Sequence, residues 1–127
     1  MKPKVSIITV VFNGENIIEK TMQSVFAQTY PNIEYIIVDG KSTDKTLQII
    51  EKYREKISVL ISEKDKGLYD AMNKGLAVAT GDYVWFMNGG DQINDAEVLT
   101  KIFSQNIDAD IFYSDTNLID EEGKYLS

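Results

Sequence analysis

Two polar segments with side chains suited to chemistry directly follow apolar runs of this sequence. Asp39 comes after the run 33–38, and Asn88-Gly89-Gly90-Asp91 comes after a later one. A carboxylate at the end of a buried strand needs hydrogen-bond donors, because its desolvation without them is costly. Asp39 could therefore accept hydrogen bonds from N–H or O–H groups of a ligand, or it could help Ser42 and Thr43 to cap the helix that follows.

The segment Asn88-Gly89-Gly90-Asp91 allows two interpretations. Its two glycines permit backbone conformations and a close ligand approach that other residues resist. The carboxylate of Asp91 could then reach a divalent cation, and oxygen ligands suit both Mg²⁺ and Mn²⁺. The same residue types are also typical of a plain turn, so the segment alone does not decide between a cation site and a turn.

Lys66 and Gly67 stand directly before a helical pattern of apolar residues. Backbone amides and the positive end of the helix dipole at such a position could meet a phosphate group. Asp70 and Lys74 are four residues apart on the same helix, a spacing that allows a surface ion pair. This segment is therefore a candidate for contact with a phosphate.

The chain of 127 residues has 13 basic and 20 acidic side chains, a net charge of -7, and neither Cys nor His. The last two absences exclude disulfides, Cys/His zinc sites, thiol nucleophiles and catalytic triads built on imidazole. The acidic balance argues against a general nucleic-acid-binding protein, which needs clustered Lys and Arg. No apolar run approaches the ~20 residues that span a bilayer, and no signal-peptide pattern opens the chain. We therefore expect a cytoplasmic protein, either free or peripheral at the inner face of the membrane.

Short β-branched apolar runs alternate with helical patterns along the chain. Apolar residues at spacings of three and four predict helices between the runs, and Gly81 is expected to form a left-handed cap after the third helix. The alternation predicts an α/β fold with a mostly parallel sheet. Ligands of such sheets bind beyond the carboxyl ends of the strands, where the polar segments lie. The predicted strands are 5–11, 33–38, 57–62, 83–87 and 111–114, and 120–124 is typical of a turn.

Two common nucleotide-binding motifs are absent. The first predicted strand is followed by Phe12-Asn13-Gly14 rather than by G-x-G-x-x-G, and G-x-x-x-x-G-K-[ST] does not occur. A Rossmann dehydrogenase and a P-loop NTPase are therefore not supported.

The order of four segments resembles the N-terminal half of a family 2 glycosyltransferase with the GT-A fold. The segments are V-S-I-I-T-V-V-F-N-G, I-I-V-D-G-K-S-T-D-K-T, E-K-D-K-G-L-Y-D-A-M-N-K-G and A-T-G-D-Y-V-W-F-M-N-G-G-D, and the resemblance covers residues 4 to about 115. It implies a single nucleotide-sugar-binding domain over 1–127, with a mostly parallel sheet that is flanked by helices and truncated at its C-terminus. It also implies inverting transfer from a nucleotide sugar, most often a UDP-sugar, to an acceptor hydroxyl in polysaccharide or glycoconjugate assembly, with Mg²⁺ or Mn²⁺ as cofactor.

The resemblance also assigns roles to individual residues by position. Asn88 and Gly90 stand in the segment that holds the D-x-D-type motif of the family, and Asp91 would be the metal ligand. Asp70 would face the sugar or lie on the helix surface. The other implied contacts are Thr9, Val11 and Asn13 in the nucleotide pocket, Asp39 at the base, and Lys66 with Gly67 beside the nucleotide or its diphosphate.

Two departures from the family pattern bear on these roles. Family members have V-D-D-G-S where this chain has V-D-G-K-S at 38–42, and the first acid of D-x-D is absent here. Relatives are also longer, and their C-terminal half supplies the acceptor site and the catalytic base. We therefore expect the base beyond residue 127, and no catalytic residue is assigned within this chain.

Two interpretations from other classes stay open. A non-catalytic nucleotide-binding or interaction module would retain the fold without the reaction, and a purely structural α/β domain would bind no ligand through Asp39. The transferase interpretation predicts a nucleotide-sugar donor and a saccharide or lipid-linked acceptor as partners, with no nucleic acid and no membrane-spanning segment. An unpaired sheet edge would also permit a homodimer.

Overall fold

A parallel sheet of four strands forms the centre of the structure, which is a computed structural model that describes residues 3–93 and 95–104. The strands lie in the order β3-β2-β1-β4. The predicted α/β fold is therefore confirmed, whereas the strand and the turn expected at 111–114 and 120–124 lie outside the described residues. The bounds are Val5–Val11 for β1, Ile33–Asp39 for β2, Val59–Ser62 for β3 and Tyr83–Phe86 for β4.

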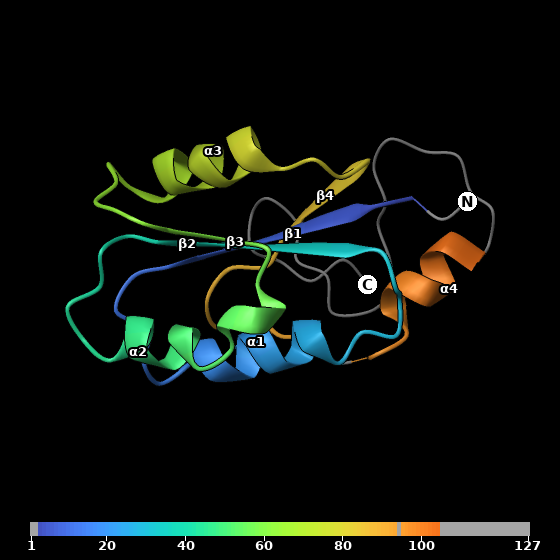
Figure 1. Ribbon diagram of the computed structural model, residues 1–127, viewed down its shortest axis with the longest axis horizontal. Coiled ribbons are helices and arrows are strands. Elements are labelled where there is room, and N and C mark those ends of the chain that lie inside the picture. The colour runs from blue at the N-terminus through green and yellow to red at the C-terminus, as the bar shows by residue number, and fades with distance from the viewer. Residues whose placement is uncertain (1–2, 94, 105–127) are drawn as a thin grey trace.

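Helices cover both faces of the sheet (Figure 1). α3 lies alone on one face, and α1, α2 and α4 pack into the core on the other. No helix in the described part of the chain is long and apolar enough to cross a membrane. The bounds are Ile18–Phe26 for α1, Thr46–Glu51 for α2, Arg54–Lys56 for the 3-10 turn η1, Leu68–Val78 for α3 and Val98–Ser104 for α4.

The strand β1 lies between β2 and β4, and all seven of its residues are buried. Val5, Ile7 and Val11 pack into the core beside α1 and α2, whereas Ile8 and Val10 pack into the core beside α3. A strand covered on both faces has no solvent side, so its sequence is a continuous apolar run rather than an alternating one. This packing fixes the carboxyl end of β1, from which the loops of the candidate site leave.

The helix α3 packs directly against the sheet at Gly75. A Cβ atom at this position would lie 2.6 Å from Ile8 Cγ2 and 3.3 Å from Val38 Cγ2, and both of these side chains are fully buried. Contacts between carbon atoms are usually roughly 3.5–4.0 Å long. Glycine at position 75 therefore sets how near α3, and the loop before it, lies to β1 and β2.

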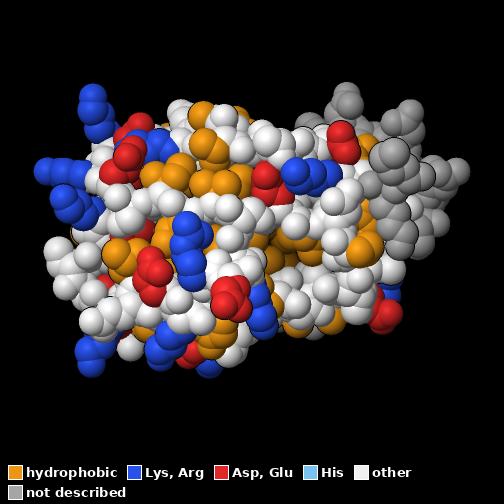
Figure 2. Space-filling model, viewed as in Figure 1, with side chains coloured by type: hydrophobic (Ala, Val, Ile, Leu, Met, Phe, Trp, Pro, Cys, Tyr) orange, Lys and Arg blue, Asp and Glu red, His pale blue; other side chains and the backbone are white. Residues whose placement is uncertain are grey.

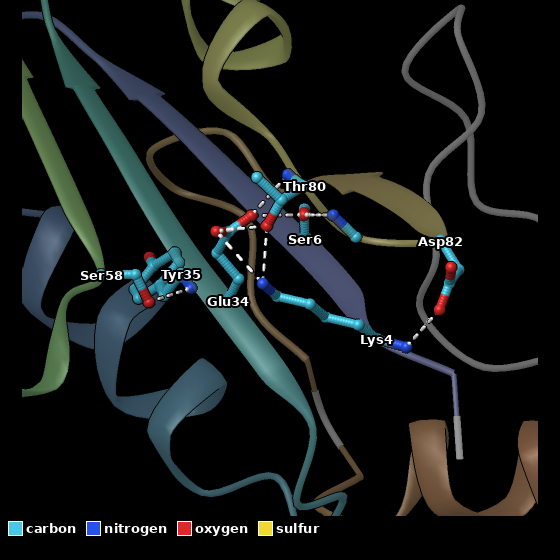
Figure 3. Close-up of polar contacts among 8 residues, drawn as sticks. Lys4, Ser6, Glu34, Tyr35, Ser58, Thr80 and Asp82 are labelled. Atoms are coloured by element: carbon cyan, nitrogen blue, oxygen red, sulfur yellow. Dashed lines mark hydrogen bonds and ion pairs between the residues drawn. The ribbon is translucent and has the colours of Figure 1, made fainter. Parts of the chain in front are cut away.

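Glu34 joins three segments at the amino ends of the strands (Figure 3). Its carboxylate accepts hydrogen bonds from Ser6 Oγ at 2.7 Å and from Thr80 N and Oγ1, both at 2.9 Å. Lys4 Nζ lies 3.6 Å from Glu34 Oε2. Burial by itself raises the pKa of Glu34, but the hydrogen bonds from Thr80 and Ser6 and the charge of Lys4 outweigh it, so the pKa is lowered. This network ties the loop between α3 and β4 to β1 and β2.

Gly81 has a different role from the one that the sequence suggests. It is not among the glycines with positive φ in the described residues, so it forms no left-handed cap. A Cβ atom on Gly81 would instead lie 2.6 Å from Ser6 Oγ and 2.9 Å from Lys4 O. Glycine is needed here because the chain passes directly against β1 as it enters β4.

Candidate functional site

Asn13 joins the loops that follow β1 and β2. Its Oδ1 accepts hydrogen bonds from the backbone N–H of Thr43 at 2.8 Å and of Asp44 at 3.3 Å. Its own N–H donates to Ser42 Oγ at 2.8 Å. Asn13 has a φ of 49°, in the left-handed region that Asn adopts more readily than most residues. The side chain of Asn13 therefore holds the two loops together.

Asp39 ends β2 at the predicted place, and its side chain is 0% exposed. Ser42 Oγ donates to Oδ1 at 2.5 Å, while Ser42 N and Ser62 Oγ donate to Oδ2 at 3.1 and 2.9 Å. These donors satisfy the carboxylate that the sequence leaves in need of partners. In the structure, Asp39 fixes the ends of β2 and β3 to each other, and its side chain is fully buried.

Asp44 supplies the side-chain hydrogen-bond acceptor at the start of α2. Asp44 Oδ1 accepts a hydrogen bond from Thr46 N at 2.9 Å, and Oδ2 accepts one from Glu15 N at 3.2 Å. Of the two alternatives for Asp39, the one in which it helps Ser42 and Thr43 to cap this helix is therefore wrong. Ser42 instead donates its N–H and its hydroxyl to Asp39, before the start of α2.

The loop after β4 returns to the last residues of β1. Gly89 N donates to Val10 O at 2.9 Å, and Gly90 N donates to Thr21 Oγ1 of α1 at 2.9 Å. Gly90 has a φ of 100°, a conformation that favours glycine. Thr21 is fully buried on α1, and it is a positioning residue that the sequence analysis missed, because a Thr among apolar helix positions gives no sign of a partner in a distant loop.

Asn88 and Asp91 bring oxygen atoms into the same turn. Asp91 N donates to Asn88 O at 2.9 Å, and Asn88 N donates to Asp91 Oδ2 at 3.1 Å. Asn88 Oδ1 is buried and has no hydrogen-bond partner among the described residues. Burial raises the pKa of Asp91, and the hydrogen bond from Asn88 opposes this shift only in part. A buried amide oxygen without a donor, beside a carboxylate, fits the oxygen ligands that Mg²⁺ and Mn²⁺ take.

The turn at Asn88 and Asp91 supplies few protein ligands for a cation. Within residues 3–93 and 95–104, no three Asp or Glu side chains are grouped so that they could hold a metal ion together. Mg²⁺ commonly binds through one or two carboxylates together with phosphates and water. A cation at this turn would therefore need oxygen atoms from a ligand or from water as well.

Val11 and Thr9 support the loops from inside the structure. A Cβ atom on Gly14 would lie 2.6 Å from Val11 Cγ2, and one on Gly89 would lie 2.9 Å from the same atom. Thr9 is fully buried, and its hydroxyl forms a hydrogen bond of 2.7 Å with Tyr35 Oη. Both residues, which the sequence analysis expects to line the nucleotide pocket, are buried in the structure.

Lys66 and Gly67 lie at the start of α3, as predicted, but their backbone amides already have partners. Lys66 N donates to Asp70 Oδ2 at 2.8 Å, and Gly67 N donates to Asp65 Oδ1 at 3.1 Å. The hydrogen bond from Lys66, together with the nearby charge of Lys74, lowers the pKa of Asp70 although partial burial opposes it. The expected ion pair between Asp70 and Lys74 is confirmed at 3.5 Å, which is the contact that the helix-surface interpretation of Asp70 predicts.

Phe12 and Asp65 are two further residues at this edge that the sequence analysis missed. Phe12 directly follows β1 and is 61% exposed, an unusual fraction for a large apolar side chain. A Cβ atom on Gly40 would lie 3.4 Å from Phe12 Cδ1 and 2.8 Å from Asp65 Oδ2. An aromatic residue at the end of an apolar run, directly before Asn-Gly, is the signal that could have identified Phe12.

Exposed lysines surround the site. Figure 2 shows Lys and Arg side chains gathered at the end of the molecule (left) where the loops after β2 and β3 lie in Figure 1. The exposed lysines of these two loops form no ion pair with a carboxylate in the part of the chain that the structure describes. The protein is acidic as a whole, yet this end offers positive charge to an anion. The exposed lysines in these loops are Lys41, Lys45, Lys64 and Lys66.

Comparison with known proteins relates this chain to one protein family. The family model described as Glycosyl transferase family 2 matches residues 6–118. The chain is 43% identical over 94 residues to the putative teichuronic acid biosynthesis glycosyltransferase TuaG of Bacillus subtilis. The aligned segment covers 72% of this chain and 37% of TuaG.

Solved structures show the same similarity. TarS of S. aureus, residues 1–349 in complex with UDP-GlcNAc, superposes with a TM-score of 0.73 at 34% identity, over 80% of this chain and 30% of that one. The mannosyltransferase PcManGT of Pyrobaculum calidifontis, in complex with GDP-Man and Mn²⁺, superposes with a TM-score of 0.76 at 25% identity, over 85% of this chain and 33% of that one. The chain thus spans about a third of the length of TuaG and of the two chains in these solved structures.

Proposed function

This chain belongs to glycosyl transferase family 2, and on that premise we propose that it forms the donor-binding part of an enzyme that transfers a sugar from a nucleotide sugar to an acceptor hydroxyl with inversion. The acceptor is a saccharide or a lipid-linked molecule, and the product belongs to a polysaccharide or glycoconjugate. Similar proteins whose names or structures mention a teichuronic acid, UDP-GlcNAc and GDP-Man support this choice of substrate class.

The observation that carries the proposal is the meeting of separate loops at the carboxyl end of β1. Gly40 N, directly after β2, donates to Val11 O at 2.9 Å, and Gly89 N, in the loop after β4, donates to the adjacent Val10 O at 2.9 Å. Asp65 reaches the same edge from the loop after β3, where it faces Gly40. Ligands of parallel α/β sheets bind at edges of this kind, where loops from several strands converge.

The chemistry of these loops suits the parts of a nucleotide sugar. The exposed ring of Phe12 can stack on a nucleobase, as aromatic side chains do with every base. The exposed lysines around the site favour the negative charge of a diphosphate. Asp91 and Asn88 Oδ1 would hold a divalent cation, which, when bound, supplies Lewis-acid stabilisation of the charge on the departing nucleoside diphosphate. The general base, an Asp or Glu that deprotonates the acceptor, would come from outside residues 1–127.

Nucleotide binding with and without Mn²⁺ tests this proposal. We expect isothermal titration calorimetry to show that the protein binds UDP or GDP, and that Mn²⁺ strengthens the binding. Asp91→Asn should remove the effect of Mn²⁺, because it replaces the only carboxylate of the turn, whereas Glu97→Gln, an exposed change six residues further on, should retain it. Failure to bind either nucleotide would refute the proposal. Binding by a protein that carries out no transfer in its complete form would favour a non-catalytic nucleotide-binding module instead.

A further inference from the structure

The helix α3 exposes three large apolar side chains on one side. Leu68, Tyr69 and Leu76 are 52%, 76% and 47% exposed. Because an α-helix turns by roughly 100° per residue, these side chains leave the helix within about 100° of one another. The buried side of the helix, at Ala71 and Gly75, faces the sheet. Exposed apolar residues that gather in one place are typical of a contact surface, and we call these three residues the apolar flank of α3.

The charged residues of α3 lie on its other flank. Asp70 and Lys74 form an ion pair at 3.5 Å, and Lys74 Nζ lies 3.2 Å from Glu63 Oε1 in the loop after β3. Both carboxylates that border this loop on the outside are therefore held by Lys74. The two other lysines of the loop, Lys64 and Lys66, are exposed and form no ion pair with a described carboxylate.

Positive charge is concentrated beside the apolar flank, although the protein as a whole is acidic. Residues 40–74, from the loop after β2 to the middle of α3, contain eight basic and six acidic side chains, whereas the rest of the chain contains five basic and fourteen acidic ones. Figure 2 shows Lys and Arg side chains at the left end of the molecule, next to apolar side chains over α3. An anionic surface would therefore attract this end of the molecule and repel the remainder.

We propose that the apolar flank of α3, together with Lys64 and Lys66, binds the surface of a membrane that contains anionic lipids. Leucine and tyrosine side chains enter the boundary between headgroups and acyl chains, and lysines beside them contact the lipid phosphates. A lipid surface thus accounts for the apolar and the basic residues together. The inference goes beyond the proposed function, because it assigns a location to the protein and requires no bound nucleotide.

Sedimentation with lipid vesicles tests this surface in the absence of any nucleotide. We expect the protein to bind vesicles that contain phosphatidylglycerol and phosphatidylcholine in equal parts, and not vesicles of phosphatidylcholine alone. The binding should weaken as the salt concentration rises, because exposed charges are screened by salt.

Two pairs of substitutions separate the apolar from the basic contribution. Leu68→Ser with Tyr69→Ser should weaken binding to the anionic vesicles on the order of 10-fold, because less apolar surface leaves water. Lys64→Gln with Lys66→Gln should weaken it on the order of 10- to 30-fold, the effect of two lysines near an anionic surface. Tyr69→Ser alone, at the most exposed of these positions, should show a smaller loss and keeps the test valid if the serine pair does not fold.

Lys20 and Lys52 provide a matched control for charge. Both are exposed, in α1 and directly after α2, and these helices cover the other face of the sheet (Figure 1). Lys20→Gln with Lys52→Gln removes the same charge and should leave vesicle binding unchanged. Equal weakening by the two lysine pairs would mean that attraction is not confined to one face, and it would overturn the inference.

The remaining outcomes keep this inference separate from the proposed function. If the unaltered protein does not bind the anionic vesicles, the inference is overturned, while nucleotide binding is decided by calorimetry alone. Binding to polyglutamate but not to vesicles would assign the lysines to an acidic protein partner instead. Self-association in analytical ultracentrifugation that Leu68→Ser with Tyr69→Ser abolishes, without vesicle binding, would assign the apolar flank to a second copy of the chain.

Discussion

Replacement of Gly75 by alanine has two effects on stability that act in opposite directions, a gain in helix propensity and a clash with the sheet. In an exposed helix interior, Ala stabilises a protein by about 1 kcal/mol relative to Gly. Here the added Cβ atom would lie 2.6 Å from Ile8 Cγ2 and 3.3 Å from Val38 Cγ2, well inside ordinary contact distance. Extra atoms in a well-packed core cost roughly 1–3 kcal/mol. We therefore expect Gly75→Ala to lower the free energy of unfolding by about 1 kcal/mol, against the gain that helix propensity alone would give.

The packing effect can be isolated within the same helix. Ala77 is exposed in the last turn of α3, so Ala77→Gly measures a loss of helix propensity without a packing change, expected at no more than about 1 kcal/mol. Adding the size of that loss to the measured destabilisation by Gly75→Ala gives the cost of the clash. Both changes are measured by urea unfolding of the protein. An increase in stability of Gly75→Ala as large as the Ala77→Gly loss would refute the close contact of α3 with β1.

The same substitution should also affect the site. The helix α3 begins directly after the loop that contains Asp65 and Lys66, so an outward shift of the helix carries this loop away from Gly40. Weaker UDP binding by Gly75→Ala, together with unchanged binding by Ala77→Gly, would confirm that the distance between helix and sheet matters for the ligand. Equal binding by both variants would contradict this part of the reasoning.

Three other changes test further contacts. Lys41 has a φ of 66°, which is unfavourable for any residue with a Cβ atom, so Lys41→Gly should raise the free energy of unfolding by about 1 kcal/mol; a loss of stability in urea would contradict this. The lowered pKa of Glu34 means that its charge stabilises the fold above the unfolded-state pKa of about 4.3 and that this contribution is lost as the pH falls through the folded-state value. Glu34→Gln should therefore flatten the acid side of the stability profile, and an unchanged acid limb would count against the network. Thr21→Val should cost about 1–3 kcal/mol, because the N–H of Gly90 loses its acceptor, and it should weaken the effect of Mn²⁺ on nucleotide binding; calorimetry that finds the effect intact would show that Thr21 does not hold the loop.

Sequence reasoning identified the elements well because their signals are local. The continuous β-branched run at 5–11 predicts a strand with both faces covered, and β1 has the predicted bounds. The third strand begins two residues later than expected, at Val59, and follows the 3-10 turn Arg54–Lys56. Spacings of three and four residues likewise predict the helices without reference to the rest of the chain.

The contacts within the site could not be predicted in the same way, since they join residues far apart in the sequence. Asp39 meets Ser62 because the register of β2 and β3 pairs the two residues. Gly81 has no room for a side chain because Ser6, 75 residues earlier in the sequence, lies against it. The sequence analysis located Asp39 correctly, but only the arrangement of strands shows that serines occupy its carboxylate and that Asp65 is the more open one.

The Cγ2 methyl group of Val11 lies against both Gly14, in the loop after β1, and Gly89, in the loop after β4. This limits which substitutions the protein can accept at position 11. A bulkier residue at position 11 would push against Gly14 and Gly89 at once, whereas a smaller one would leave a void beneath both. A substitution at position 11 therefore cannot shift one of these loops without also affecting the other. Engineering of donor preference through position 11 would therefore also displace the turn proposed to hold the cation, and compensating changes would be required at two sites rather than one.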